Sequence, residues 1–283
     1  MAVTIVNDQI PRGPVTTTIN YYSVPKDGSA PFNYVESPPA GQPERNYSDE
    51  AFSVTLQDAR GREDEFNLDK DSFQLLSNVP RSKEKDFIND DSIRRNYYPE
   101  VEQLIFDNIP NCKKVFIFDH TIRSWNPNAA RPPLTRCHLD QTPASAVARV
   151  RYHLPKEAEE LLEGRFRIIN IWMPVNGPVV EFPLGIVSAS SAKEEEYVGI
   201  KHIYPDHDGE TGGVKYSDEH QWYYWSGIDC NERIMLQCFD SDAFRPGSKV
   251  VGGRAPHSAF QDPRTPKNAA HRVSIEVRAL VFC

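Results

Sequence analysis

The sequence predicts a mainly β protein with flanking helices (α+β), whose strands form a double-sheet, cupin-like jelly roll or a barrel. Seven segments rich in β-branched and aromatic residues follow one another after residue 112, and only residues 143–163 interrupt them with helical pattern. Many short strands with few crossover helices are typical of double-sheet β folds and disfavour a doubly wound parallel sheet. The segments are KKVFIFDHTIR, RFRIINIWMPV, FPLGIVSAS, YVGIKHIYP, HQWYYWSGI, RIMLQCFDS and HRVSIEVRALVFC.

The chain is expected to form a single domain in three successive parts. The first part holds many of the 23 prolines around one strand-like run, residues 15–24, which predicts an arm that wraps the body. The parts are an irregular N-terminal arm (1–50), a mostly helical cap (51–112) and the jelly-roll core (113–283), and together they span residues 1–283.

Two segments carry the helical prediction for the cap. Aspartates begin the segment 69–76 and are good helix caps. Residues 90–108 carry apolar side chains at helical spacing, with Pro99 near a helix start. Ahead of both, the runs before and after the turn at residues 61–62 predict a hairpin.

Composition and charge exclude several classes of protein. The net charge of −8 offers no broad basic surface, which argues against a nucleic-acid partner. No apolar run approaches the roughly 20 residues needed to cross a bilayer, so we expect a soluble protein without a membrane partner. Five scattered cysteines without a C-x-x-C pair favour free thiols in the reducing cytoplasm over a disulfide framework. A homo-oligomer is compatible with this composition.

The heptapeptide RCHLDQT holds the strongest chemical signal. Residues i and i+2 of a strand project from one face, so His138 and Asp140 point the same way. His257, in the late strand region, is the candidate third ligand. Two imidazoles and one carboxylate form the facial triad of non-haem Fe(II) oxygenases, which leaves coordination positions open for a cosubstrate and O₂. The sequence therefore predicts three catalytic metal ligands, with Gln141 or Thr142 as candidate groups that orient them.

An enzyme of this kind also needs a cation for the far carboxylate of 2-oxoglutarate, and the planar fork of arginine suits a carboxylate. Arg272, Ser274 and Arg278 alternate onto one face of the terminal strand, so strand parity does not choose between the two arginines. Six residues at about 3.3 Å each separate them by roughly 20 Å. Only one of them can therefore anchor a small dicarboxylate.

Four large side chains are candidates to line an apolar substrate pocket near the mouth of the barrel, as expected for a small-molecule site. Core packing is the alternative role for the aromatic residues, because aromatic side chains favour strands and cores in any case. The candidates are Trp172, Met173, Trp222 and Trp225.

Two other functions fit part of this pattern. A non-catalytic jelly-roll protein that binds a small molecule would share the fold, but it would not need the three intact ligands. A cupin-like metal hydrolase would use zinc, which is more often bound by three histidines or with cysteine, and Arg272 with Ser274 would then have no role.

Several longer motifs resemble a mostly fungal hydroxylase/desaturase family that includes a gibberellin desaturase and proteins related to a cephem methoxylase subunit. The resemblance spans roughly residues 15–283. The motifs that carry it are FIFDHTIR, CHLDQTPASAVARVR, RFRIINIWMPVNGPV, PLGIVSA, YPDHDGET, QWYYWSGI, CFDSD, PHSAFQDPRTP and HRVSIEVRALVF.

The resemblance implies a double-stranded β-helix, Fe(II) and 2-oxoglutarate, and the oxidation of a small secondary-metabolite intermediate by hydroxylation, desaturation or oxidative cyclisation. The family's H-x-D and distal histidine fall on His138, Asp140 and His257. Its R-x-S falls on Arg272 and Ser274, which favours Arg272 over Arg278 as the anchor of 2-oxoglutarate. Met173 departs from the family, whose members usually have arginine there. If that arginine contacts the substrate, this chain takes a less anionic or differently placed one.

Overall fold

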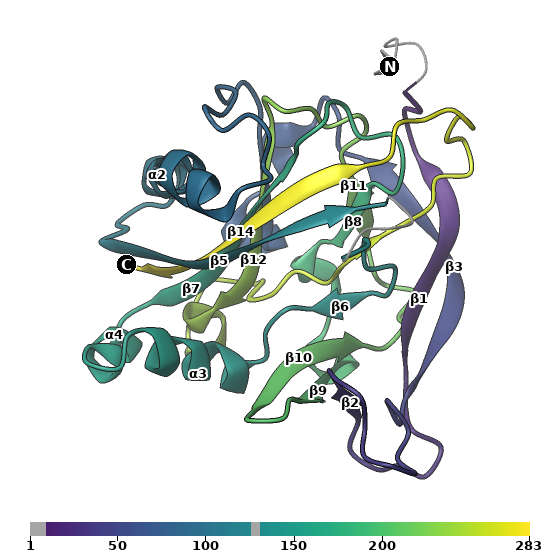
Figure 1. Cartoon of the computed structure of the whole chain (residues 1–283), viewed down its shortest axis with the longest axis vertical. Coiled ribbons are helices and arrows are strands. Elements are labelled where there is room, and N and C mark those ends of the chain that lie inside the picture. Colours follow the sequence, from purple (N-terminus) through teal and green to yellow (C-terminus); the bar gives the residue numbers. More distant parts are fainter. Residues whose placement is uncertain (1–9, 126–130) are drawn as a thin grey trace.

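Two β-sheets face each other in the computed structural model, which describes residues 10–125 and 131–283 (Figure 1). The larger sheet contains, in spatial order, β1 (Val15–Ser23), β3 (Ser48–Asp58), β11 (Trp222–Tyr224), β8 (Leu184–Val187), β13 (His257–Ala259), β6 (His138–Leu139), β10 (Asp208–Val214), β9 (Tyr197–Ile203) and β2 (Phe32–Tyr34). The smaller sheet contains β4 (Phe73–Leu76), β12 (Arg233–Asp240), β7 (Phe166–Pro174), β14 (Val273–Phe282) and β5 (Lys114–Ser124). The mainly β fold class with flanking helices is confirmed.

The helices lie outside this pair of sheets (Figure 1). The α-helices are α1 (Leu68–Asp71), α2 (Asp90–Asn108), α3 (Pro143–His153) and α4 (Ala158–Glu163), and short 3₁₀ turns cover Glu63–Glu65, Ala189–Ser191, Glu194–Glu196 and Ser241–Phe244. None of the helices in the described ranges is both long enough and apolar enough to span a bilayer.

Strand alternation divides the core into layers. In β7 the even-numbered Ile168 and Trp172 pack between the sheets, whereas the odd-numbered Ile171 and Met173 pack on the opposite face of the smaller sheet, where α2 covers them. The larger sheet has its own second layer, which includes Cys137. A side chain on either sheet therefore either enters the space between the sheets or faces away from it.

The segment 51–112 is less helical than expected. The predicted hairpin is wrong: β3 pairs over nine residues with β1, and a 3₁₀ turn follows it at Glu63–Glu65. The helix predicted at residues 69–76 is shorter and begins one residue earlier, at Leu68–Asp71. The second half of the segment, Phe73–Leu76, is a strand that pairs with β12 and buries alternate side chains. Pairing with distant strands here overrides local helix signals.

The long helix of this segment is confirmed at Asp90–Asn108, but Pro99 lies inside it and not near its start. The helix begins where the Asn89 side chain accepts a hydrogen bond from the Ser92 amide. In the N-terminal arm the expected strand is also present, and Phe32–Tyr34 adds a second one that pairs with β9.

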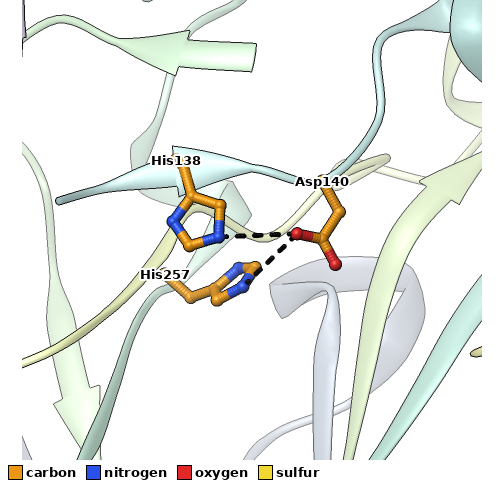
Figure 2. A group of neighbouring side chains, drawn as sticks. All are labelled: His138, Asp140 and His257. Carbon is orange, nitrogen blue, oxygen red and sulfur yellow. Dashed lines mark ion pairs between the residues drawn. The ribbon is translucent and has the colours of Figure 1, made fainter. Parts of the chain in front are cut away.

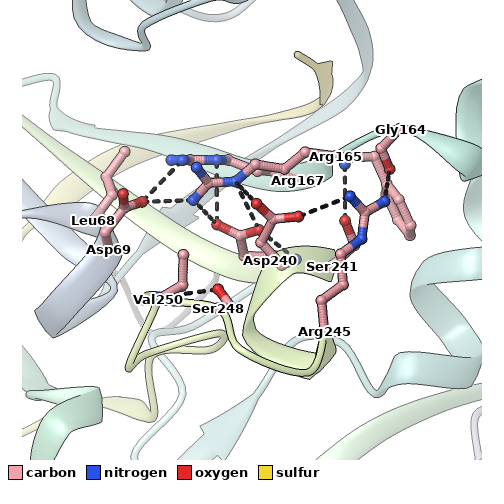
Figure 3. Close-up of polar contacts among 12 residues, drawn as sticks. Leu68, Asp69, Gly164, Arg165, Arg167, Asp240, Ser241, Arg245, Ser248 and Val250 are labelled. Atoms are coloured by element: carbon pink, nitrogen blue, oxygen red, sulfur yellow. Dashed lines mark hydrogen bonds and ion pairs between the residues drawn. The ribbon is translucent and has the colours of Figure 1, made fainter.

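A network of charged side chains joins the ends of β7 and β12 to α1 (Figure 3). The buried carboxylate of Asp240 accepts hydrogen bonds from Arg165 at 3.1 and 2.6 Å and lies 3.2 Å from Nε of Arg167. Asp69 accepts from the same two arginines at 2.6 and 2.9 Å. Arg245 donates to the carbonyls at the end of α4. These arginines have counter-charges or carbonyl partners, so the network braces the fold.

Candidate metal centre and active site

His138 and Asp140 point into the space between the sheets from β6 and the residue after it. Leu139, between them, packs in the opposite layer with Cys137. Nε2 of His138 lies 3.4 Å from Oδ1 of Asp140. The shared face predicted from the H-x-D spacing is therefore confirmed.

His257 completes the group from β13, the strand next to β6 (Figure 2). It is paired directly with His138, and the two ring centres are 4.3 Å apart. Nε2 of His257 lies 3.8 Å from Oδ1 of Asp140. One ligand atom from each of the three residues lies within 4.8 Å of the others, which is the spacing of a metal site.

Both imidazoles are oriented by the same kind of hydrogen bond. Nδ1 of His138 lies 2.8 Å from the carbonyl oxygen of Arg136, and Nδ1 of His257 lies 3.0 Å from that of Ala255. A carbonyl only accepts, so each Nδ1 carries a proton and each Nε2 faces Asp140, as a lone pair in the neutral ring and as a donor in the protonated ring. This is the tautomer that binds a metal through Nε2.

The charge states also suit a metal. Burial raises the pKa of the Asp140 carboxyl, but the hydrogen bond from His138 and the charges of His257 and His138 outweigh burial and hold that pKa well below its usual range. Burial and then the neighbouring His138 lower the pKa of His257 to about 4. At neutral pH the site therefore presents a carboxylate and a neutral imidazole, the forms that ligate metals.

Asn170 and Cys238 hold the second oxygen of Asp140, and sequence reasoning missed both. Nδ2 of Asn170 donates to Oδ2 of Asp140 at 2.7 Å, and Sγ of Cys238 lies 3.5 Å from the same oxygen. Asn170 is a polar residue in the fully buried strand β7, and that anomaly was the available signal. Oδ1 is left to face the two histidines.

The predicted orienting roles of Gln141 and Thr142 are not observed. Thr142 caps α3 by accepting from the Ser145 amide at 3.1 Å and donates its hydroxyl proton to Glu210. Gln141 accepts from the Ser145 hydroxyl at 2.9 Å. Both side chains serve the start of the helix after the H-x-D motif.

Arg272 is a buried cation for which the described residues supply no counter-ion. Its side chain is nearly inaccessible, it forms no ion pair within the described ranges, and its Nε has no hydrogen-bond partner. It donates to the Phe182 carbonyl and lies over the Trp172 ring at 5.6 Å. Burial and then the charge of Arg123 lower the pKa of Arg272 to about 9. A buried guanidinium of this kind fits an anionic ligand that completes it.

Arg278, the other candidate anchor, already has partners. Its Nε donates to Asp119 at 2.6 Å, one Nη donates to Thr121 at 2.5 Å, and the other lies 3.4 Å from Glu276. The guanidinium of Arg278 is thus already bound by side chains of the protein.

Of the four side chains expected near a substrate, two face away from the metal ligands. Met173 packs under α2, where Tyr97 donates its hydroxyl to the sulfur at 3.7 Å. Trp222 packs in the outer layer and donates its indole N–H to Tyr21 at 2.8 Å. The pocket roles predicted for Met173 and Trp222 are therefore wrong, and the inference about substrate charge, which required residue 173 to contact the substrate, loses its basis.

The other two lie in the core between the sheets. Trp172 is next to Arg272, as described, and Trp172 shares its strand face with Asn170. Trp225 donates its indole N–H to Glu63 at 2.9 Å and stacks with Arg60 at 4.6 Å. Both therefore lie on the side of the sheets that carries the metal ligands.

Comparisons with known proteins agree with this geometry. A family model described as an oxidoreductase/YMDC permease-like domain matches residues 19–282. The hydroxylase/desaturase poxK of Penicillium oxalicum is 38% identical, over 96% of this chain and 92% of its own length. The Fe(II)/2-oxoglutarate-dependent dioxygenase nvfI of Aspergillus novofumigatus is 28% identical, over 88% and 90% of the two chains.

A solved structure has the same fold. The iron and alpha-ketoglutarate-dependent endoperoxidase NvfI superposes with a TM-score of 0.83 at 24% identity, covering 96% of this chain and 99% of the other. The jelly-roll prediction is thereby confirmed. With the match to poxK along nearly the whole chain, the protein belongs to the fungal hydroxylase/desaturase family of Fe(II)/2-oxoglutarate-dependent dioxygenases.

Proposed function

We propose that this chain oxidises a small secondary-metabolite intermediate, with Fe(II) held by His138, Asp140 and His257 and 2-oxoglutarate anchored at Arg272 and Ser274. The single observation that carries the proposal is the convergence of the three ligand atoms within 4.8 Å, with both histidines in the Nε2-ligating tautomer. Two nitrogens and one carboxylate oxygen are the donor set that suits non-haem iron. The residues present therefore fit the group.

Iron(II) with 2-oxoglutarate and O₂ supplies an oxidant able to remove a hydrogen atom from a substrate C–H bond, and the cosubstrate leaves as succinate and CO₂. The protein holds the three metal ligands in position. The carbonyls behind the two imidazoles fix the rings, and Asn170 fixes the carboxylate. The apolar core between the sheets keeps water from the site, and Trp172 and Trp225 are candidates to contact the substrate.

The unpaired guanidinium of Arg272 supports an oxygenase over the two alternative functions. A hydrolase with a bound zinc ion needs no dicarboxylate, and a simple binding protein needs no metal ligands. A cosubstrate with a distal carboxylate satisfies Arg272, with the buried hydroxyl of Ser274 two residues along the same strand face. Named relatives include hydroxylases, desaturases and an endoperoxidase, so we propose hydroxylation, desaturation or oxidative cyclisation as the outcome.

The remaining parts of the proposal concern location and partners. A cytoplasmic location is supported by the five cysteines, all of which are free thiols. The proposed partners are the small-molecule substrate, 2-oxoglutarate and O₂, without nucleic acid or membrane, and a homo-oligomer is compatible with them.

Anaerobic titration tests this function. Adding 2-oxoglutarate to the protein with Fe(II) should produce the weak visible charge-transfer band of the chelate. Asp140→Ala should remove the band, whereas Asp206→Ala, at an exposed aspartate paired with His207, should leave it unchanged. A wild-type protein that binds Fe(II) without producing this band on addition of 2-oxoglutarate contradicts the proposal.

A further inference from the structure

Arg123 lies beside the proposed 2-oxoglutarate anchor, on the strand next to it. On β5 it is directly opposite Ser274 of β14. The Trp125 amide donates to the Arg272 carbonyl at 3.1 Å, which extends the pairing of β5 with β14 by one residue. Residues two apart on a strand share a face, so Arg123 and Arg272 are diagonal neighbours on either side of the Ser274 position. Diagonal neighbours in a sheet have Cα atoms about 7–8 Å apart, within reach of long side chains.

The two arginines together have too few counter-charges. Arg272 forms no ion pair among the described residues. Within the described residues, Arg123 has one ion-pair partner, the Glu276 carboxylate at 3.5 Å. Glu276 is shared, because it also lies 3.4 Å from Arg278. Arg123 also donates a hydrogen bond to the Pro132 carbonyl at 3.2 Å.

The arrangement costs energy when no anion is present, because the charge of the partly buried Arg123 lies near that of the fully buried Arg272. Burial and then the charge of Arg123 lower the pKa of Arg272, which indicates that the two guanidinium groups repel each other. Arg123 is therefore within electrostatic reach of the proposed anchor.

We propose that Arg123 and Arg272 together clamp the distal carboxylate of 2-oxoglutarate, with the hydroxyl of Ser274 between them. The inference rests on the proposed function. A carboxylate has two oxygens with about four acceptor positions, so it can accept hydrogen bonds from two guanidinium groups and a hydroxyl at once. Separate anions on the two arginines would repel each other at this spacing, which favours one shared carboxylate over a second, substrate-borne anion at Arg123.

Binding measurements on two cosubstrates separate this role from a structural one. The dissociation constants of 2-oxoglutarate and of pyruvate, which lacks the distal carboxylate, are measured anaerobically with the Fe(II)-loaded protein. Arg123→Gln should weaken 2-oxoglutarate binding by about 10-fold or more, the usual effect of losing a charge-assisted hydrogen bond. Pyruvate binding should change less than about 2-fold, since a uniform loss would instead mean damage at the metal. Arg123→Lys should restore part of the affinity because it keeps the charge and loses the fork.

Arg94→Gln is the matched control. Arg94 is exposed on α2, where its partner is Asp90, and the variant should bind both cosubstrates as the wild type does. If the wild type binds 2-oxoglutarate and Arg123→Gln binds it equally well, the clamp is wrong and the proposed function stands. Equal weakening of 2-oxoglutarate and pyruvate also overturns the clamp. Failure of the wild type to bind 2-oxoglutarate contradicts the proposed function itself.

Discussion

His257 lies directly opposite His138 in neighbouring antiparallel strands, with ring centres 4.3 Å apart. Each ring is oriented by the carbonyl of the residue two positions earlier in the chain, just before its strand. The two imidazoles thus occupy equivalent places on adjacent strands, and only Asp140 needs a support from the other sheet. That support is Asn170 of β7, with Cys238 of β12 close to the same oxygen.

Asn170→Leu should lower the affinity for Fe(II) by about 10- to 100-fold, the usual cost of losing a partner that orients a metal ligand. The leucine keeps the volume in β7 but leaves Oδ2 of Asp140 without its amide donor. Metal affinity is measured by anaerobic titration, with the melting temperature as a check on folding. Asn108→Ala is the control, since among the described residues that side chain bonds to a carbonyl of its own helix. Unchanged iron affinity in Asn170→Leu would show that Asn170 does not position Asp140.

Arg272→Met and Arg278→Met should have opposite effects. Without Arg272 the 2-oxoglutarate carboxylate loses its fork, at a cost of about 2–4 kcal/mol or a roughly 30- to 1000-fold weaker affinity. The same change should leave the ligand-free protein as stable or more stable, because it removes a buried unpaired charge. Arg278→Met breaks the contacts with Asp119 and Glu276 and should lower the melting temperature. If only Arg278→Met weakens 2-oxoglutarate binding, the choice of Arg272 is wrong.

Trp172 should report 2-oxoglutarate binding by its fluorescence, because its ring lies 5.6 Å from the guanidinium that the cosubstrate would contact. Addition of 2-oxoglutarate to the metal-loaded protein should change the emission of the wild type and of Trp222→Phe. The change should be small or absent in Trp172→Phe. Trp222 is the matched comparison, since it is equally buried but faces the outer layer. A signal that survives in Trp172→Phe and disappears in Trp222→Phe would reverse this assignment.

The sequence predicted the metal ligands because their geometry is local or comes from a known pattern. His138 and Asp140 needed only strand parity, and His257 needed the order of ligands along a jelly roll. The register that pairs His257 with His138 depends on tertiary packing, so it cannot be predicted from the H-x-D spacing. Arg123 was missed for the same reason: its pairing with Ser274 joins strands that are far apart in the chain.

The errors over the pocket residues have a simpler cause. Adjacent residues of a strand face opposite ways, so Trp172 and Met173 could not both line one pocket. The odd spacing of Trp222 and Trp225 gave the same warning. His257 pairs with Ile186, which pairs with Tyr223, so the face toward the metal carries residue 223 and excludes Trp222. Alternation was readable from the sequence, but which face was which depended on this register.

The central claim is that His138, Asp140 and His257 hold one metal ion, and a crystal structure of the metal-loaded protein tests it most directly. Data collected at the iron absorption edge should show one anomalous peak between these side chains. The peak should lie about 2.0–2.2 Å from Nε2 of each histidine and from a carboxylate oxygen of Asp140, the usual distances for such ligands. A fully loaded protein whose metal lies elsewhere, or without His257 among its ligands, would contradict the account.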